Sequence, residues 1–190
     1  MQTTVDVEAL LARANERGDA TSLIIDLKLV SAEKIRIFAA SLARDALKAV
    51  ENVDLRAVRC VRAAEAYALG TLSANTYEHT RQIYSHAHIA WTEVQAVVQQ
   101  KPVEPPHMLW ALRDARMAAF ILLNDVFAAD VCPDVWYAAG CVIPLYATAM
   151  ARSRLIPEKT ARWVAAHHQA IDKVEHDLIA LVRSEKESGC

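Results

Sequence analysis

The stretch LWALRDARMAAFILLNDVFAA, residues 109–129, predicts more about the fold than any other part of this chain. At about 100° per residue, as in an α-helix, its apolar side chains fall on nearly every side, while Asp114 and Asp125 lie roughly opposite the main apolar stripe. A helix of this kind belongs inside a bundle. The stretch therefore predicts an all-α fold around a central hydrophobic helix. The main stripe consists of Leu109, Leu112, Phe120, Leu123 and Phe127.

Arg116 interrupts that apolar stripe, with Arg113 on its flank. A buried guanidinium is costly unless a carboxylate or a carbonyl oxygen pairs with it. Two interpretations stay open: an internal ion pair, or a groove in which Arg113 and Arg116 bind an anion or a partner's acidic side chain. The acids considered for an internal pair are Asp45, Asp54 and Glu65.

Composition supports one helical domain and argues against nucleic-acid binding. The chain has 190 residues, with only four glycines and six prolines, which leaves few turns for a sheet. Its 21 basic and 23 acidic side chains give a net charge of −2 without a charged tail, so we expect no nucleic-acid partner. Four scattered cysteines and the lack of a signal peptide predict a reduced, cytoplasmic protein.

Two apolar runs need interpretation. Residues 21–30 fit a strand or a helix, and we expect a helix because no partner strand exists elsewhere. Residues 135–151 form an uncharged run of 17 residues, shorter than the roughly 20 that a membrane-spanning helix needs. We therefore expect a buried core helix there and no membrane partner.

The domain organisation follows from one internal break. Residues 101–106 contain three prolines and predict a loop between a front half, residues 1–100, and a back half, residues 107–187. Together these halves predict a single-domain bundle of seven to eight helices over residues 1–187. We expect residues 188–190 to form a disordered tail.

Capping residues predict where several helices begin and end. Ser31 and Asp54 are expected N-caps, and Gly18 and Gly70 are expected helix ends. Pro133 is expected near the first position of the helix that follows it.

His168, Asp172 and His176 are the best metal candidates, although a weak set. Their spacing of four residues places them on one side of a helix, and three nitrogen and oxygen ligands suit zinc. The same side carries Lys173 and Glu175, which is typical of a solvated polar face. We therefore expect no metal and no cofactor.

The remaining histidines and motifs give little support to catalysis. Glu104 and His107 match a di-iron spacing, but across two prolines in a loop. His86 and His88 share no helix face and indicate surface positions, whereas His167 lies near an apolar seam and indicates packing. The chain has no Gly-x-Ser-x-Gly motif and no glycine-rich phosphate loop, so an enzyme is the less favoured class.

The segment 54–70 resembles a known family. It is similar to the Asp-x-Arg … Ala-Ile-x-Ala-Ala … Trp-x-x-Gly pattern of the alanine-rich, all-helical immunity proteins of bacterial polymorphic toxin systems. Two departures are Ala57-Val58 for a Pro-Arg step and Tyr67 for the tryptophan. The resemblance implies a protein that binds and silences a toxin without turnover. The residues that carry the resemblance are Asp54, Arg56, Cys60, Val61, Ala63, Ala64, Tyr67 and Gly70.

Two functions from different classes remain. The first is a protein-binding module that neutralises a toxin or another effector enzyme. The second is a small-molecule, anion or metal-binding helical protein, or an enzyme, with a pocket beside the central helix near Arg113, Arg116, His86 or His88. The apolar excess also allows a homodimer interface. The candidate binding residues are Asp54, Arg56, Arg113 and Arg116.

Overall fold

The computed structural model describes residues 7–51, 54–71, 77–100, 107–154 and 160–188, and all regular structure in these segments is helical. The predicted all-α class is confirmed. Of the nine helices in the described segments, α7 has only 4 residues, so eight longer helices agree with the predicted number. The helices are α1 (Val7–Arg17), α2 (Ala20–Asp26), α3 (Ala32–Ala49), α4 (Leu55–Ala68), α5 (Tyr77–Gln100), α6 (His107–Ile121), α7 (Asn124–Phe127), α8 (Val135–Ser153) and α9 (Ala161–Ser188).

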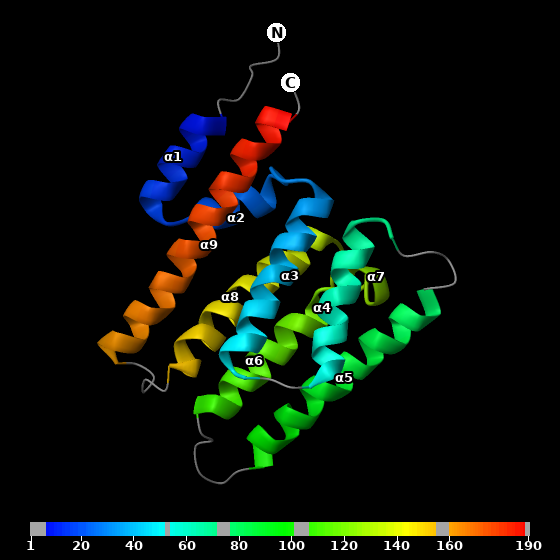
Figure 1. The fold of residues 1–190 in the computed structure, drawn as a ribbon. Helices are drawn as coiled ribbons and strands as arrows, with labels where there is room; N and C mark the ends of the chain where they lie inside the picture. The colour runs from blue at the N-terminus through cyan, green and yellow to red at the C-terminus, as the bar shows by residue number, and fades with distance from the viewer. Residues whose placement is uncertain (1–6, 52–53, 72–76, 101–106, 155–159, 189–190) are drawn as a thin grey trace.

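The helices share one core around α6, which packs against α3, α4, α5 and α8 (Figure 1). α8 also packs along α3, and α9 packs on α8 and α2. The start of α1 lies beside the end of α9, where Arg183 is 3.6 Å from Glu8 (Figure 1). The predicted front and back halves are therefore not separate units. Residues 101–106, the predicted loop, lie outside the described residues.

The predicted central helix is interrupted. α6 ends at Ile121, and the short α7 begins only at Asn124. Arg36 of α3 donates a hydrogen bond to the Leu122 carbonyl oxygen at 2.8 Å, and its guanidinium also pairs with Asp125 of α7. The carbonyl groups at a helix end lack intrahelical partners, so a buried arginine stabilises the chain in this broken form. The prediction of one helix over residues 109–129 is wrong for this reason.

The buried face of α6 also differs from the predicted one. The leucine and phenylalanine stripe is mostly half-buried, and Leu123, which follows the helix, is its only fully buried member in the described chain. Small side chains instead face the core, because they let neighbouring helices approach closely. Asp114 lies among them, at 1% exposure. The buried residues of α6 are Ala111, Asp114, Ala115, Ala118, Ala119 and Ile121.

α8 is the buried core helix that the sequence predicts for residues 135–151. It presents small and branched side chains to the bundle and continues through Pro144. Among the described helices, none combines the length and the apolar character needed to cross a membrane. The buried residues of α8 are Val135, Ala138, Ala139, Val142, Ile143, Tyr146, Ala147, Ala149 and Ala151.

Most predicted helix ends are confirmed. Ser31 caps α3 by accepting from the Lys34 N–H, and Asp54 caps α4. Gly18 and Gly70 follow α1 and α4 with φ of 72° and 64°, a conformation that glycine adopts without strain. Residues 21–30 are helical only in part, because α2 ends at Asp26.

Pro133 lies two positions before the first residue of α8, Val135, and not near the first helical position as predicted. Asp134 is the N-cap, since its carboxylate accepts from the Tyr137 N–H at 2.8 Å. Pro133 therefore precedes the cap and does not occupy the first turn. A proline suits that position as well, because it donates no backbone hydrogen bond.

α9 stabilises the beginnings of two other helices. Glu175, only 7% exposed, accepts a hydrogen bond from the Ala20 N–H at 2.8 Å, where α2 has no side-chain cap of its own. Glu185 accepts from the Ser31 N–H at 2.8 Å, at the start of α3. Each carboxylate pairs with an N–H group that would otherwise lack an intrahelical partner.

The apolar seam of α9 is buried at its centre and exposed at its beginning. Val174 and Leu178 are fully buried, whereas Val164 is 39% exposed. The helix continues to Ser188, so the predicted tail at residues 188–190 is wrong at its first position, and residues 189–190 lie outside the described part.

Candidate functional site

The beginning of α4 brings together three of the four predicted binding residues. Asp54 has extended backbone angles and accepts from the Arg56 N–H at 2.9 Å, which starts the helix. The Arg56 side chain folds back on the same carboxylate, with its Nη2 2.7 Å from Oδ2. These hydrogen bonds from Arg56 are the main reason that the pKa of Asp54 lies below its ordinary value.

Arg56 also joins α4 to α5. Its Nη1 donates to Glu93 at 3.0 Å, and the hydrogen bond with Glu93 is the main reason that the pKa of Arg56 is raised. The same bond lowers the pKa of Glu93. Arg56 is therefore charged and has carboxylates on two sides.

Arg116 reaches this cluster from α6. Its Nη1 lies 3.2 Å from Asp54 Oδ2 and donates to the Ala90 carbonyl oxygen of α5 at 2.9 Å. The side chain is 13% exposed, and burial lowers its pKa. Of the two interpretations of Arg116, the structure supports an internal ion pair, and its acid is Asp54.

Arg113 belongs to a different cluster. Its Nε donates to Asp114 at 2.8 Å, and Arg152 of α8 donates to the other oxygen of that carboxylate at 2.5 Å. Both guanidinium groups also lie over the Trp110 ring, at 4.4 and 5.3 Å from its centre. The two arginines and the ring thus enclose a carboxylate whose pKa burial raises.

Sequence reasoning missed three buried charged side chains, Asp114, Arg36 and Glu175. Asp114 is nearly inaccessible, although the predicted stripe placed it on the far side of the helix. Its position among alanines was the available signal, since a face of small residues also suits close helix packing. Arg36, 5% exposed, pairs with Asp125 and lies 4.9 Å from the Tyr67 ring centre. Its place on the apolar face of α3 was the corresponding signal.

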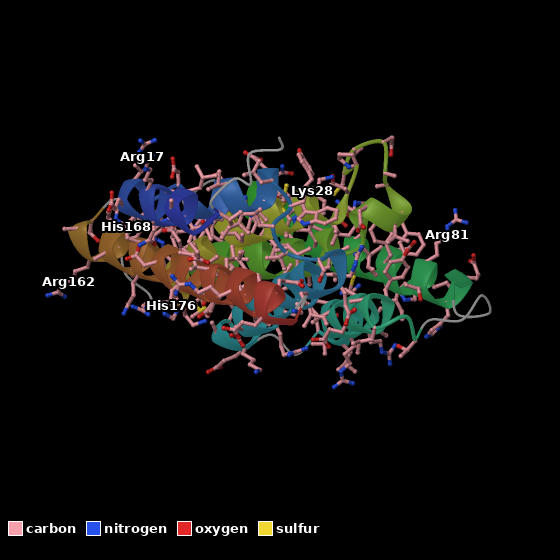
Figure 2. The ribbon with its side chains drawn as sticks, turned by 90° about the horizontal axis from the view of Figure 1, so that it is seen from above. Arg17, Lys28, Arg81, Arg162, His168 and His176 are labelled. Carbon is pink, nitrogen blue, oxygen red and sulfur yellow. The ribbon has the colours of Figure 1, made fainter. Side chains whose placement is uncertain are left out.

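The metal candidates do not assemble. His168, Asp172 and His176 are exposed on α9, and Figure 2 shows both histidines at the outer surface. Within the part of the chain that the structure describes, no three His, Cys, Asp or Glu side chains could hold a metal ion. His176 lies 3.4 Å from Asp177, and Lys173 pairs with the same carboxylate. This side of the helix is solvated at the metal candidates and Lys173, but the prediction for Glu175 is wrong, because Glu175 is buried and accepts from the Ala20 N–H.

The other histidines act in packing or lie at the surface. His167 stacks on Trp163 at 5.3 Å between ring centres, and burial lowers the pKa of His167. His88 is exposed, but its ring lies 4.9 Å from Phe120 and 5.6 Å from Trp91. Glu104 lies outside the described residues, so the di-iron spacing is not tested.

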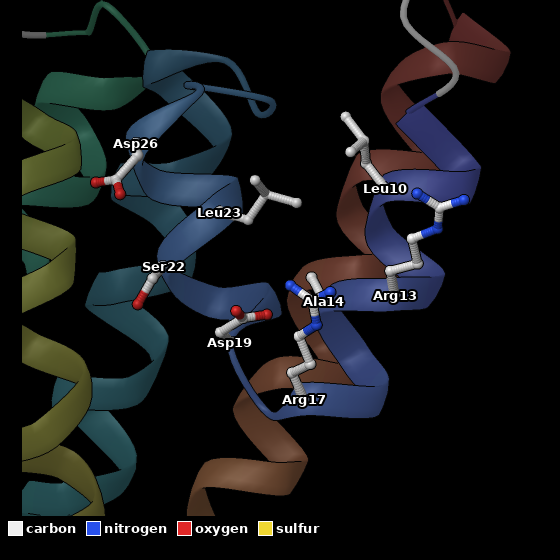
Figure 3. Close-up of a pocket in the computed structure, with 8 residues that line it drawn as sticks. All are labelled: Leu10, Arg13, Ala14, Arg17, Asp19, Ser22, Leu23 and Asp26. Carbon is white, nitrogen blue, oxygen red and sulfur yellow. The ribbon is translucent and has the colours of Figure 1, made fainter.

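Two cavities lie beside α1. One, of about 350 Å³, separates α1 from α2, and Figure 3 shows Leu10 and Leu23 pointing toward each other across it. The other, of about 360 Å³, lies between the end of α1 and α9 and includes Asp172 and His176 in its lining. Both are open grooves lined mainly by exposed polar side chains.

The outward side of α4 differs from its inward side. We call it the α4 face and define it as Leu55, Arg59, Arg62 and Leu69, whose spacings of four, three and seven residues place them in one line. The two leucines are 63% and 58% exposed, and both arginines are exposed. Among the described residues, no carboxylate pairs with Arg59 or Arg62, in contrast to Arg56 and Arg116.

Comparison with known proteins gives no relative. The chain matches no protein-family model, no curated protein and no solved structure. Its function therefore has to be inferred from the geometry of its own residues.

Proposed function

We propose that this protein is a protein-binding module that neutralises a toxin or another effector enzyme by occupying its surface. The α4 face carries the proposal. It lies on the same segment, residues 54–70, that resembles the immunity proteins, and the resemblance implies binding without turnover. We expect such a protein to act in the cytoplasm, where a cell would need protection.

The two exposed leucines mark the ends of a contact strip. Leu55 and Leu69 are separated by 14 residues, which corresponds to about 21 Å along a helix axis. Large exposed apolar side chains at helical spacing suit a partner's groove or flat surface. Between them, the aliphatic parts of the Arg59 and Arg62 side chains can continue the apolar contact. Arginine is also among the residue types enriched at protein interfaces.

The inward side of α4 supports a rigid contact surface. Arg56 connects α4 to Glu93 of α5, and Asp54 connects it to Arg116 of α6. A helix held from behind by ion pairs loses little conformational freedom when a partner binds its outer side. Three of the four charged residues that the sequence predicts to bind a partner, Asp54, Arg56 and Arg116, thus support the surface and do not form it.

The direct experiment screens the products of the neighbouring genes for one that stops growth, and uses that toxin as the probe. We expect the purified proteins to form a complex, and co-expression to prevent the toxin's effect on growth. Replacing both leucines, Leu55→Gln with Leu69→Gln, should weaken the complex by at least about tenfold. The net charge does not change, and both sites are exposed, so thermal stability should stay within error.

The matched control replaces two apolar residues of similar exposure elsewhere, Val131→Gln with Tyr137→Gln. This variant should bind like the wild type. Equal weakening by both variants, or binding that neither variant changes, would contradict a contact at the α4 face. Light scattering measures the molar mass of the free protein and tests a further outcome. If the free protein is a dimer in which a second copy covers this face, the proposal fails.

A further inference from the structure

The two arginines of the α4 face carry charge that the described chain does not neutralise. Arg59 and Arg62 stand three residues apart on the exposed side of the helix. Other arginines of the bundle interior have carboxylate partners. Those pairs are Arg36 with Asp125, Arg56 with Asp54 and Glu93, Arg113 and Arg152 with Asp114, and Arg116 with Asp54.

Exposed arginines without a described carboxylate partner also occur on α1, at Arg13 and Arg17, whereas the arginines of the α4 face lie between two exposed leucines. The whole chain has a net charge of −2, so attraction of an acidic partner is not a property of the molecule as a whole. The nearest acid in the α4 sequence, Glu65, pairs with Arg44 of α3 and leaves the two arginines uncompensated. An acidic partner that reaches the α4 face meets positive charge and exposed leucines together, and local charge of this kind orients the encounter.

We infer that the surface bound by the α4 face is acidic, with carboxylates opposite Arg59 and Arg62 and apolar side chains opposite Leu55 and Leu69. This inference rests on the proposed function and specifies its partner. A guanidinium binds a carboxylate through two parallel hydrogen bonds, which gives each pair a defined geometry. The basic clefts that bind nucleic acids would repel this face. A toxin that binds the α4 face is thus covered at an acidic surface of its own and not at a nucleic-acid-binding cleft.

The test uses two synthetic amphipathic helical peptides. Both have leucine at the same apolar positions, and the polar positions are glutamate in one peptide and lysine in the other. We expect the glutamate peptide to bind the full-length protein at least about tenfold more tightly than the lysine peptide. Its association rate should fall as salt is raised to about 0.15 M, where the Debye length is about 8 Å.

Charge-removing variants then locate the contact. Arg59→Gln with Arg62→Gln should remove most of the preference for glutamate. The matched control, Arg13→Gln with Arg17→Gln, removes two exposed arginines of α1 that also lack a described carboxylate partner, and it should bind like the wild type. An unchanged preference in the Arg59 and Arg62 variant, or its loss in the control as well, would overturn the inference.

The leucine variants separate this inference from the proposed function. If Leu55→Gln with Leu69→Gln weakens peptide binding while the arginine variant does not, the α4 face binds proteins but does not select acidic ones. If neither pair of substitutions changes binding, the α4 face is not the contact and both conclusions fail.

Discussion

Asp54 and Arg116 lie 3.2 Å apart, and this contact connects the first turn of α4 to the middle of α6. The same carboxylate accepts from the Arg56 N–H, so one side chain both starts a helix and joins two helices. The stability of this junction can be tested separately from binding, because none of these residues belongs to the α4 face.

Arg116→Met should destabilise the protein less than Arg116→Ala. Asp54 keeps Arg56 as a partner in both variants, so we expect a cost of about 1–2 kcal/mol for the methionine variant, well below that of an unpaired buried charge. The alanine variant also loses the packing of the aliphatic stem, for about 1–2 kcal/mol more. Urea unfolding at neutral pH measures both values. A larger loss for methionine than for alanine would contradict the proposed packing.

Asp54→Asn should change how stability depends on pH. Because the folded state lowers the pKa of Asp54, its carboxylate stabilises the protein above the unfolded-state pKa, about 3.9, and this contribution is lost as pH falls through the lower folded-state value. Asparagine still caps the helix but cannot form the ion pair. The difference in unfolding free energy between wild type and variant should therefore shrink toward acidic pH. A difference that is constant with pH would exclude this role.

Arg36→Met should be among the most damaging single substitutions. It leaves Asp125 without its buried partner and removes the hydrogen bond to the Leu122 carbonyl, for a cost of about 3–5 kcal/mol. Arg36→Met with Asp125→Asn should cost less than the sum of the single substitutions, because the unpaired charge is gone. Additive free energies in urea unfolding would show that the two side chains do not interact.

Glu175→Ala should loosen α1 and α2 but not the rest of the bundle. The Ala20 N–H loses its acceptor, and α2 has no side-chain cap to replace it. We expect faster amide exchange in α1 and α2, with α6 and α8 unchanged. Glu175→Gln is the control, because its amide oxygen still accepts the hydrogen bond. Equal exchange rates in the two variants would contradict the capping role.

Local chemistry in the sequence was enough to predict the all-α class, the caps at Ser31 and Asp54 and the ends at Gly18 and Gly70. A cap depends on one side chain and on N–H groups two or three residues away, so it is encoded locally. The pairing of Arg116 with one of three named acids was also predictable in outline, because a buried guanidinium requires a partner.

Only the tertiary structure decided which charges remain free. Arg56, Arg59 and Arg62 lie within seven residues of one another, yet the folded bundle brings a carboxylate of α5 to Arg56 and leaves the two arginines of the α4 face exposed. The break between α6 and α7 has the same origin, since it depends on Arg36 from a helix 86 residues away. Ion pairs between distant helices depend on how those helices pack, and the periodicity of a single helix carries no information about its neighbours.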